Sequence, residues 1–212
     1  MMDFLINDVS TKSLGFHLNP LFSIGQPKVK KIMVDVPFSH GQLDLTESVT
    51  DEVLYGNRLI EFTLEKTRPK SEWYSVYNDF VSRFHGKVVE VVPPYESDYY
   101  FKGRMEVGAM ARGDYMSFQV LIDCEPFRIK NNLTIVSLSS TATESTVNLE
   151  NSFAKTVPTI ETDGAITVKH GSNQWSLNAG NHTLPIILNQ GSNSIGVSGV
   201  ANVVIRYQER VI

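Results

Sequence analysis

The side chains that could carry out acid–base chemistry gather in one acidic segment of this 212-residue chain. Glu47, Asp51 and Glu52 lie close together, and a pair of carboxyl groups with different pKa values is what hydrolysis of a glycosidic bond requires. The residues around them are typical of an exposed polar connection. We therefore interpret the segment as a solvated loop, and we keep a wall-cleaving enzyme as an alternative.

Elsewhere the sequence has no catalytic or metal-binding motif. The five histidines are scattered, and the chain has no CxxC, HExxH or HxH pattern, no GxSxG elbow and no Walker loop. Cys124, the single cysteine, alternates with Val120 and Ile122 along a predicted strand, which predicts a buried thiol. We expect no enzymatic activity, no bound metal and no cofactor.

Trp175 is the one side chain that could bind a sugar, because glycans stack on flat aromatic faces. It lies within a predicted hairpin, where a tryptophan is also typical of a core residue. Both interpretations stay open at this point, and Trp175 is kept as a candidate glycan contact.

The composition is that of a folded chain without a strong electrostatic preference. It has 42% hydrophobic and 20% charged residues, which suits a globular core. The net charge of −4 gives no reason to expect binding to nucleic acid or to an anionic membrane. The N-terminus lacks the pattern of a secretory signal, and no apolar run is long enough to span a bilayer, so we expect no membrane insertion.

A change of composition divides the chain into two predicted domains, residues 1–130 and 131–212. The first carries 15 Lys+Arg and 18 Asp+Glu, whereas the second carries only 4 and 5. In the second, 29 of 82 residues are Ser, Thr or Asn. The second domain must therefore fold with a polar but nearly uncharged surface.

The first domain is predicted to combine strands with one helix. Residues 31–38 and 58–66 alternate apolar and polar side chains, as half-buried strands do, and in the latter run Glu61, Thr63 and Glu65 form the wet face. Between Ser71, a predicted N-cap, and Gly86, a predicted left-handed stop, aromatic and aliphatic residues recur at steps of three and four. This spacing predicts an amphipathic helix whose broad apolar face packs on its own sheet or on another subunit.

The second domain is predicted to be a small antiparallel β-sandwich. Short alternating runs are separated by turn residues, for example around residues 170–173 and 190–193. The fold class expected for the whole chain is therefore mainly β, or β-rich α+β.

Several segments together resemble the distal tail protein (Dit) family of long-tailed phages and prophages of Gram-positive bacteria. The similarity covers essentially the whole chain, in the order and approximate spacing of the family. The segments are SHGQLDLTESVTDEVLYGNRLIEFTLE from residue 39, SEWYSVYNDFVSRFHG from residue 71, YYFKGRMEVGAMARGDYMSFQVLIDCEPF from residue 99, and QGSNSIGVSGVANVVIRYQERVI from residue 190.

The resemblance implies a homohexameric ring at the distal end of the tail, with a channel through which DNA passes without sequence recognition. The N-terminal domain, a β-sandwich or barrel-like structure, would form the ring between the tail tube protein and the tail-tip or baseplate hub protein. The C-terminal domain, implied to be galectin-like or a jelly roll, would project outwards, where it can hold a receptor-binding protein. The protein would be made in the host cytoplasm and reside in the virion.

Such a channel needs a lining that does not retain DNA. Glu61, Thr63 and Glu65 would give one strand a neutral or repulsive face, whereas a basic lining would hold DNA electrostatically. These three residues are therefore candidates for the lumen.

Some members of the family carry long insertions that grasp receptor-binding proteins or bind carbohydrate. Residues 131–212 have no room for such a module, which favours a plain adaptor. A cell-wall glycan-binding module of a tail-tip complex, resting on Trp175, is the alternative.

Overall fold

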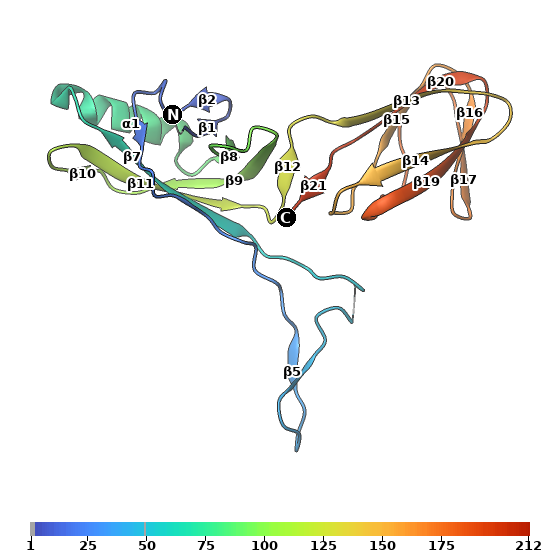
Figure 1. Ribbon diagram of the computed structural model, residues 1–212, viewed down its shortest axis with the longest axis horizontal. Helices are drawn as coiled ribbons and strands as arrows, with labels where there is room; N and C mark the ends of the chain where they lie inside the picture. Colours follow the sequence, from blue (N-terminus) through green and yellow to red (C-terminus); the bar gives the residue numbers. More distant parts are fainter. Residues whose placement is uncertain (1–2, 49) are drawn as a thin grey trace. The chain divides into compact units, whose positions relative to one another are not determined.

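The computed structural model describes residues 3–48 and 50–212 (Figure 1). The chain divides into two units, the first running to Arg128 and the second from Ile129 to Val211, while Ile212 groups with the first. The boundary predicted from the sequence lies two residues later, between 130 and 131. Both units consist mainly of antiparallel strands, and the described residues contain one α-helix, which confirms the predicted mainly β fold class.

The first unit is built around three long strands, β7, β9 and β11. The other elements are short strands, one 3₁₀ helix and the α-helix. In chain order the elements are β1 (Leu5–Ile6), β2 (Val9–Ser10), β3 (His17–Leu18), β4 (Ser23–Ile24), β5 (Met33–Asp35), β6 (Gln42–Asp44), β7 (Arg58–Lys66), η1 (Lys70–Glu72), α1 (Trp73–Phe84), β8 (Val88–Val92), β9 (Tyr99–Val107), β10 (Ala111–Arg112), β11 (Met116–Cys124) and, at the junction with the second unit, β12 (Arg128–Lys130).

The main sheet of the first unit has the strand order β2-β1-β8-β9-β11-β7-β3, with β4 also paired to β7 and β10 to β11. β11 pairs with β7 along its whole length, from Met116 opposite Lys66 to Cys124 opposite Arg58. In β7 every second residue is buried, starting at Arg58, which is the alternation that the sequence predicted. Because successive side chains point to opposite faces, the sheet has one dry face and one polar face.

The sheet curls until strands far apart in its order meet over the core. Phe4, next to β1, stacks on Phe62 of β7 with ring centroids 4.3 Å apart, although β8, β9 and β11 lie between the two strands in the sheet. Phe22 meets the ring of Phe4 edge-on at 5.4 Å. These aromatic contacts bend the sheet towards a barrel.

Helix α1 packs on the dry face of the sheet. Phe80 and Phe84 are buried, and the ring of Phe80 lies 5.3 Å from that of Phe118 on β11. The helix is thus covered by its own chain. The predicted N-cap at Ser71 is wrong: the chain enters α1 through η1, which contains Ser71, and the N-cap position belongs to Glu72.

Two glycines of the first unit stand where a side chain is excluded. Gly86 follows α1 with a φ of +73°, the left-handed stop that the sequence predicted. Gly103 of β9 lies so close to β11 that a Cβ atom would stand 2.4 Å from the carbonyl oxygen of Asp123 and 2.6 Å from the Cα atom of Cys124. Gly103 therefore sets how closely β9 and β11 approach.

The second unit is a sandwich of two four-stranded antiparallel sheets, as predicted. The sheets have the orders β13-β20-β15-β18 and β14-β19-β16-β17. Its core consists mainly of aliphatic side chains, together with the ring of Tyr207, and these alternate with exposed polar residues. The strands of the sandwich are β13 (Thr134–Ser140), β14 (Ser145–Asn151), β15 (Thr159–Thr162), β16 (Ile166–His170), β17 (Asn173–Leu177), β18 (Gly180–Thr183), β19 (Gly191–Ser198) and β20 (Ala201–Tyr207). The last strand, β21 (Arg210–Val211), pairs with β12 instead.

A buried carboxylate joins the beginning and the end of the second unit. Glu209, whose side chain is 9% exposed, accepts hydrogen bonds from Lys130 at 2.8 Å and from the hydroxyl groups of Thr134 and Ser152. Burial raises the pKa of this carboxyl group, but the hydrogen bonds from Lys130, Ser152 and Thr134 together outweigh burial and lower the pKa to about 2. The ionised carboxylate is therefore part of the folded structure.

Replacing Gly103 by alanine should destabilise the first unit by about 1–3 kcal/mol, because the added methyl group would force β9 and β11 apart. Gly113→Ala is the matched control, since a Cβ atom there meets no other atom within 4 Å. Urea unfolding, followed by the fluorescence of Trp73 in a Trp175→Phe background, measures the difference. Equal unfolding midpoints for the two variants would contradict the packing argument.

Glu209→Gln should destabilise the second unit by about 1–3 kcal/mol at neutral pH. The folded pKa of about 2 lies below the ordinary 4.5, so the stabilisation is complete above pH 4.5 and is lost as the pH falls from 4.5 towards 2. The difference between wild type and variant should shrink over that window. Urea unfolding followed by Trp175 fluorescence in a Trp73→Phe background measures it.

The control is Glu144→Gln, because Glu144 pairs with Lys169 in an exposed contact that should contribute less than about 1 kcal/mol. If Glu209→Gln and Glu144→Gln had the same effect at neutral pH, the proposed role of the buried carboxylate would be wrong.

Candidate functional site

A two-stranded ribbon, called the arm below, leaves the first unit between β4 and β7. The arm comprises residues 28–48 and 50–56, and its strands β5 and β6 pair with each other and, within the described chain, with no other strand. Figure 1 shows the arm extending away from the main sheet of this unit. Backbone hydrogen bonds join its two legs, from the N–H groups of Gly56, Lys30 and Leu45 to the carbonyl groups of Lys28, Leu54 and Ile32, respectively.

One face of the arm is aliphatic and open to solvent. Val34 stands opposite Leu43, and alternate residues of paired strands share a face. The opposite face is mainly polar, with Asp35 opposite Gln42 and Met33 opposite Asp44. An isolated two-stranded ribbon is marginally stable in water, and a contiguous apolar surface marks a contact with another molecule. The aliphatic face carries Ile32, Val34, Val36 and Leu43, which are 42–52% exposed, and the less exposed Leu45.

The tip of the arm presents an aromatic ring to solvent. Phe38 is fully exposed, and its φ of +63° lies in the left-handed region that bulky residues rarely adopt. Gly41, with a φ of +79°, completes the turn. An exposed ring held on a strained backbone is what a contact with a partner would explain.

Consecutive residues from Tyr55 to Arg58 fasten the arm to the sheet. Arg58 is buried, although it is charged, and burial is the main cause that lowers its pKa. The Tyr-Gly-Asn-Arg sequence that contributes to the family resemblance is thus the anchor of the arm. The contacts are the ring of Tyr55 with that of Phe127 at 6.0 Å, the amide of Asn57 with the carboxylate of Asp123 at 3.1 Å, and the guanidinium group of Arg58 with the ring centre of Phe101 at 5.1 Å.

Residues 31–38 were predicted to form a strand of the first domain, and the sequence did not indicate that they belong to an arm. Alternation of apolar and polar residues looks the same in a strand that covers a core and in an exposed ribbon. A usable signal was the charge at both sides of the alternating run, because edge strands are protected by charged residues. Lys28, Lys30 and Lys31 precede the run, and an acidic segment follows it.

Glu61, Thr63 and Glu65 lie on the polar face of the main sheet. Glu61 accepts a hydrogen bond from the side-chain amide of Gln119, and Glu65 accepts one from Asn19 at 2.6 Å. The structure therefore brings the three predicted residues together on one surface of β7, next to β11. Their position in a channel stays a prediction.

The clustered acids of the sequence lie on the returning leg of the arm. Glu47 and Asp51 are exposed and Glu52 is half-buried, and the N–H group of Asp51 donates to the carbonyl group of Glu47 at 2.9 Å. Among the residues that the structure describes, no group of three or more His, Cys, Asp or Glu side chains is arranged to hold a metal ion. None of the described helices has the length and apolar character that crossing a bilayer requires.

Cys124 is buried in the core of the first unit, as predicted. Burial, with a smaller contribution from Asp123, raises the pKa of its thiol to about 12. The thiol therefore stays protonated at neutral pH and is a poor nucleophile.

Trp175 stands on β17 opposite Val168 and packs, partly buried, against the core of the second unit. This placement follows from the alternation of β17, which directs Trp175 and Leu177 inwards. A glycan contact at Trp175 stays a prediction.

Comparison with known proteins gives a likeness in structure rather than in sequence. No family model matches the sequence, and no curated protein matches it. Among solved structures, the crystal structure of the Dit protein of phage SPP1 matches at a TM-score of 0.73 and 12% identity, covering 100% of both chains. That protein is described as a paradigm of the hub adsorption apparatus of phages that infect Gram-positive bacteria.

A de novo designed double-stranded β-helix matches 38% of this chain at 17% identity and a TM-score of 0.26, which is too low to bear on the fold. The likeness to the SPP1 protein extends over both units of this chain. The chain therefore has the fold of SPP1 Dit, and the resemblance to the distal tail protein family is confirmed at the level of the fold.

Proposed function

We propose that this chain is a structural, non-enzymatic protein of the distal end of a phage tail. In this proposal six copies form a ring that joins the tail tube to the tail tip or baseplate and surrounds a channel for DNA. The full-length fold likeness to the Dit protein of phage SPP1 supports the role. The single observation that carries it is the arm, whose aliphatic face is not covered by its own chain.

A head-to-tail contact between copies would bury the arm. When the arm of one copy docks on a different surface of the next copy, the contact repeats, and a rotation that closes produces a ring. The first unit offers exposed aliphatic side chains outside the arm, among them Leu21 and Val88. Burying each half-exposed side chain of the arm would contribute roughly 1 kcal/mol per contact.

The ring would have two different sides. The tail tube protein would contact one side, and the tail-tip or baseplate hub protein the other. The second unit would face outwards, where a receptor-binding protein is a further partner. The protein would be made in the cytoplasm of the host bacterium and would function in the virion.

The polar face of β7 suits the channel. Glu61 and Glu65 are acidic, Thr63 between them is neutral, and Gln119 adds an uncharged amide beside them. DNA phosphates are repelled by such a surface, whereas lysine or arginine would bind them and release counterions. In the proposed ring this face of β7 lines the lumen, so that DNA slides without being retained.

Val34→Asp/Leu43→Asp should prevent ring formation, because burying two uncompensated carboxylates at the contact costs several kcal/mol. Met33→Lys/Gln42→Lys adds two charges to the opposite face of the same two strands, where each lysine stands opposite an aspartate, and should leave assembly intact. Native mass spectrometry and electron microscopy of the full chain should show a hexamer with a central hole for wild type and for this control.

If the wild-type chain is monomeric by itself, the tail tube protein is added as a template. Ring formation is then compared again between the wild type and the two double variants. Rings formed equally well by Val34→Asp/Leu43→Asp would contradict the role of the arm. A wild-type chain that never forms a ring, with or without the tube, would contradict the proposed function.

Glu61→Lys/Glu65→Lys should convert a ring that ignores DNA into one that retains it. The variant ring should bind duplex DNA of one defined length, and this binding should weaken steeply with added salt, because contacts between lysine and phosphate depend on salt. Asp79→Lys/Asp114→Lys, which reverses two charges outside β7, is the control. If the β7 variant released DNA as freely as wild type in an ejection assay, β7 would not line the lumen.

A further inference from the structure

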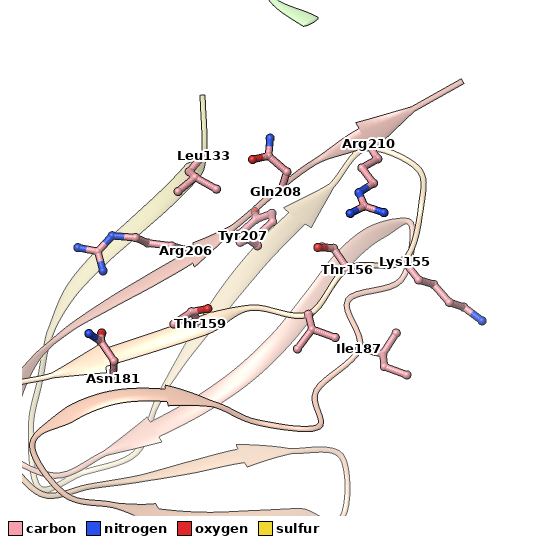
Figure 2. A pocket seen from close by; sticks show the side chains of 11 residues that line it. Leu133, Lys155, Thr156, Thr159, Asn181, Ile187, Arg206, Tyr207, Gln208 and Arg210 are labelled. Carbon is pink, nitrogen blue, oxygen red and sulfur yellow. The ribbon is translucent and has the colours of Figure 1, made fainter. Parts of the chain in front are cut away.

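The second unit contains an open groove of about 880 Å³ that none of the sequence motifs indicated. Figure 2 shows its lining, which comes from β20 and β21, from the segment around residues 155–159, and from Asn181 and Ile187. All of these residues belong to the second unit. The floor includes Tyr207, which is buried and donates its hydroxyl group to the carbonyl group of Glu150 at 2.6 Å.

The groove collects the positive charge of the second unit. The second unit contains five Lys and Arg residues, and three of them, Lys155, Arg206 and Arg210, line the groove. Of the other two, Lys130 pairs with Glu209 and Lys169 pairs with Glu144. None of the residues that line the groove carries a carboxylate. In a unit with so few charges, this concentration creates a local positive potential for an anionic ligand.

Two of these cations are available to a ligand. Arg206 pairs with Glu161, but the side chains are 35% and 44% exposed, and such a pair is readily exchanged for another carboxylate. Among the residues that the structure describes, none forms a hydrogen bond or an ion pair with the side chain of Arg210. Figure 2 shows the two guanidinium groups on opposite sides of Gln208. Guanidinium groups bind carboxylates through two parallel hydrogen bonds.

The groove is also apolar at its margins. Leu133, Val157 and Ile187 are each about half exposed, at 47%, 47% and 49%. An anionic ligand with apolar side chains would cover these three residues. The other class of anionic ligand, a polyol phosphate chain, has no apolar side chains and would leave them exposed. An aromatic platform for a sugar is missing among the lining residues, because the ring of Tyr207 is buried and Trp175 lies elsewhere.

We propose that this groove binds an acidic peptide segment of another protein, in which carboxylate and aliphatic side chains are interspersed. Its carboxylates pair with Arg206 and Arg210, and its aliphatic side chains cover Val157, Ile187 and Leu133. The site uses no residue of the arm, so this peptide site can exist whether or not the chain forms a ring.

The test uses the full-length chain on an array of short peptides that combine Asp or Glu with Leu, Ile or Val. Each acidic peptide has a counterpart in which Asn or Gln replaces the acid. Acidic peptides should bind and their amide counterparts should not, and added salt should weaken binding. Titration calorimetry then measures the affinity of the best peptide.

Arg206→Gln/Arg210→Gln should weaken this peptide at least about tenfold, since each charge-assisted hydrogen bond contributes more than a neutral one. Val157→Asn/Ile187→Asn should weaken it as well, although the charge is unchanged. Lys169→Gln, a cation of the same unit outside the groove, should have no effect. Val34→Asp/Leu43→Asp should bind the peptide normally, which separates this proposal from ring formation.

Three outcomes would overturn the proposal. The first is no binding to any acidic peptide, and the second is equal binding to the amide counterparts. The third is tighter binding to poly(glycerol phosphate) that Val157→Asn/Ile187→Asn leaves unchanged, because the groove would then be a site for a polyanion rather than for a peptide.

Discussion

In a single copy of this chain, water is in contact with the aliphatic face of the arm. A ribbon of two strands has two faces, and among the residues that the structure describes no further strand pairs with it. The strained backbone at Phe38 adds to the free energy of the isolated state. A partner that buries this surface lowers the free energy of the arm and stabilises one conformation of it at the same time. The arm thus connects the fold of the first unit to assembly.

The rest of the first unit can be understood as a rigid support for this ribbon. β7 continues directly from the returning leg of the arm and is paired along its length with β11. At the junction, Arg58 is buried against Phe101, and Asn57 is held by Asp123. Burying a guanidinium group in a core is costly, so the contact of Arg58 with Phe101 helps to determine where the arm leaves the sheet. The curled sheet, with α1 packed on its dry face, is the base from which the arm extends.

Local patterns in the sequence predicted the elements that bury a face against their own chain. The alternation in β7 and the three- and four-residue spacing in α1 both report directly on such burial. The arm was not predicted, because apolar and polar residues alternate in the same way whether the apolar face is covered by the same chain or by another one. Ser71 was misassigned because a serine before a helix can also lie within a preceding 3₁₀ turn, and only the backbone path distinguishes the two.

The groove could not be predicted for a different reason. Leu133, Val157, Ile187 and Arg210 are far apart in the sequence, and only the sandwich topology brings them to one surface. The shift to few charges after residue 130 was visible, but the sequence does not show that most of the remaining cations converge. By contrast, Glu61, Thr63 and Glu65 come from one strand, so their common face could be inferred from the period of two alone.

The strands at the two ends of the second unit are neighbours. β12 pairs with β21, the N–H group of Lys130 donates to the carbonyl group of Glu209 at 3.1 Å, and the side chain of Gln208 donates to the carbonyl group of Lys130. A module whose first and last strands pair with each other is closed by its own hydrogen bonds. Evolution can enlarge or exchange such a module while the scaffold that carries it stays the same, and a protein engineer can graft a foreign domain in its place.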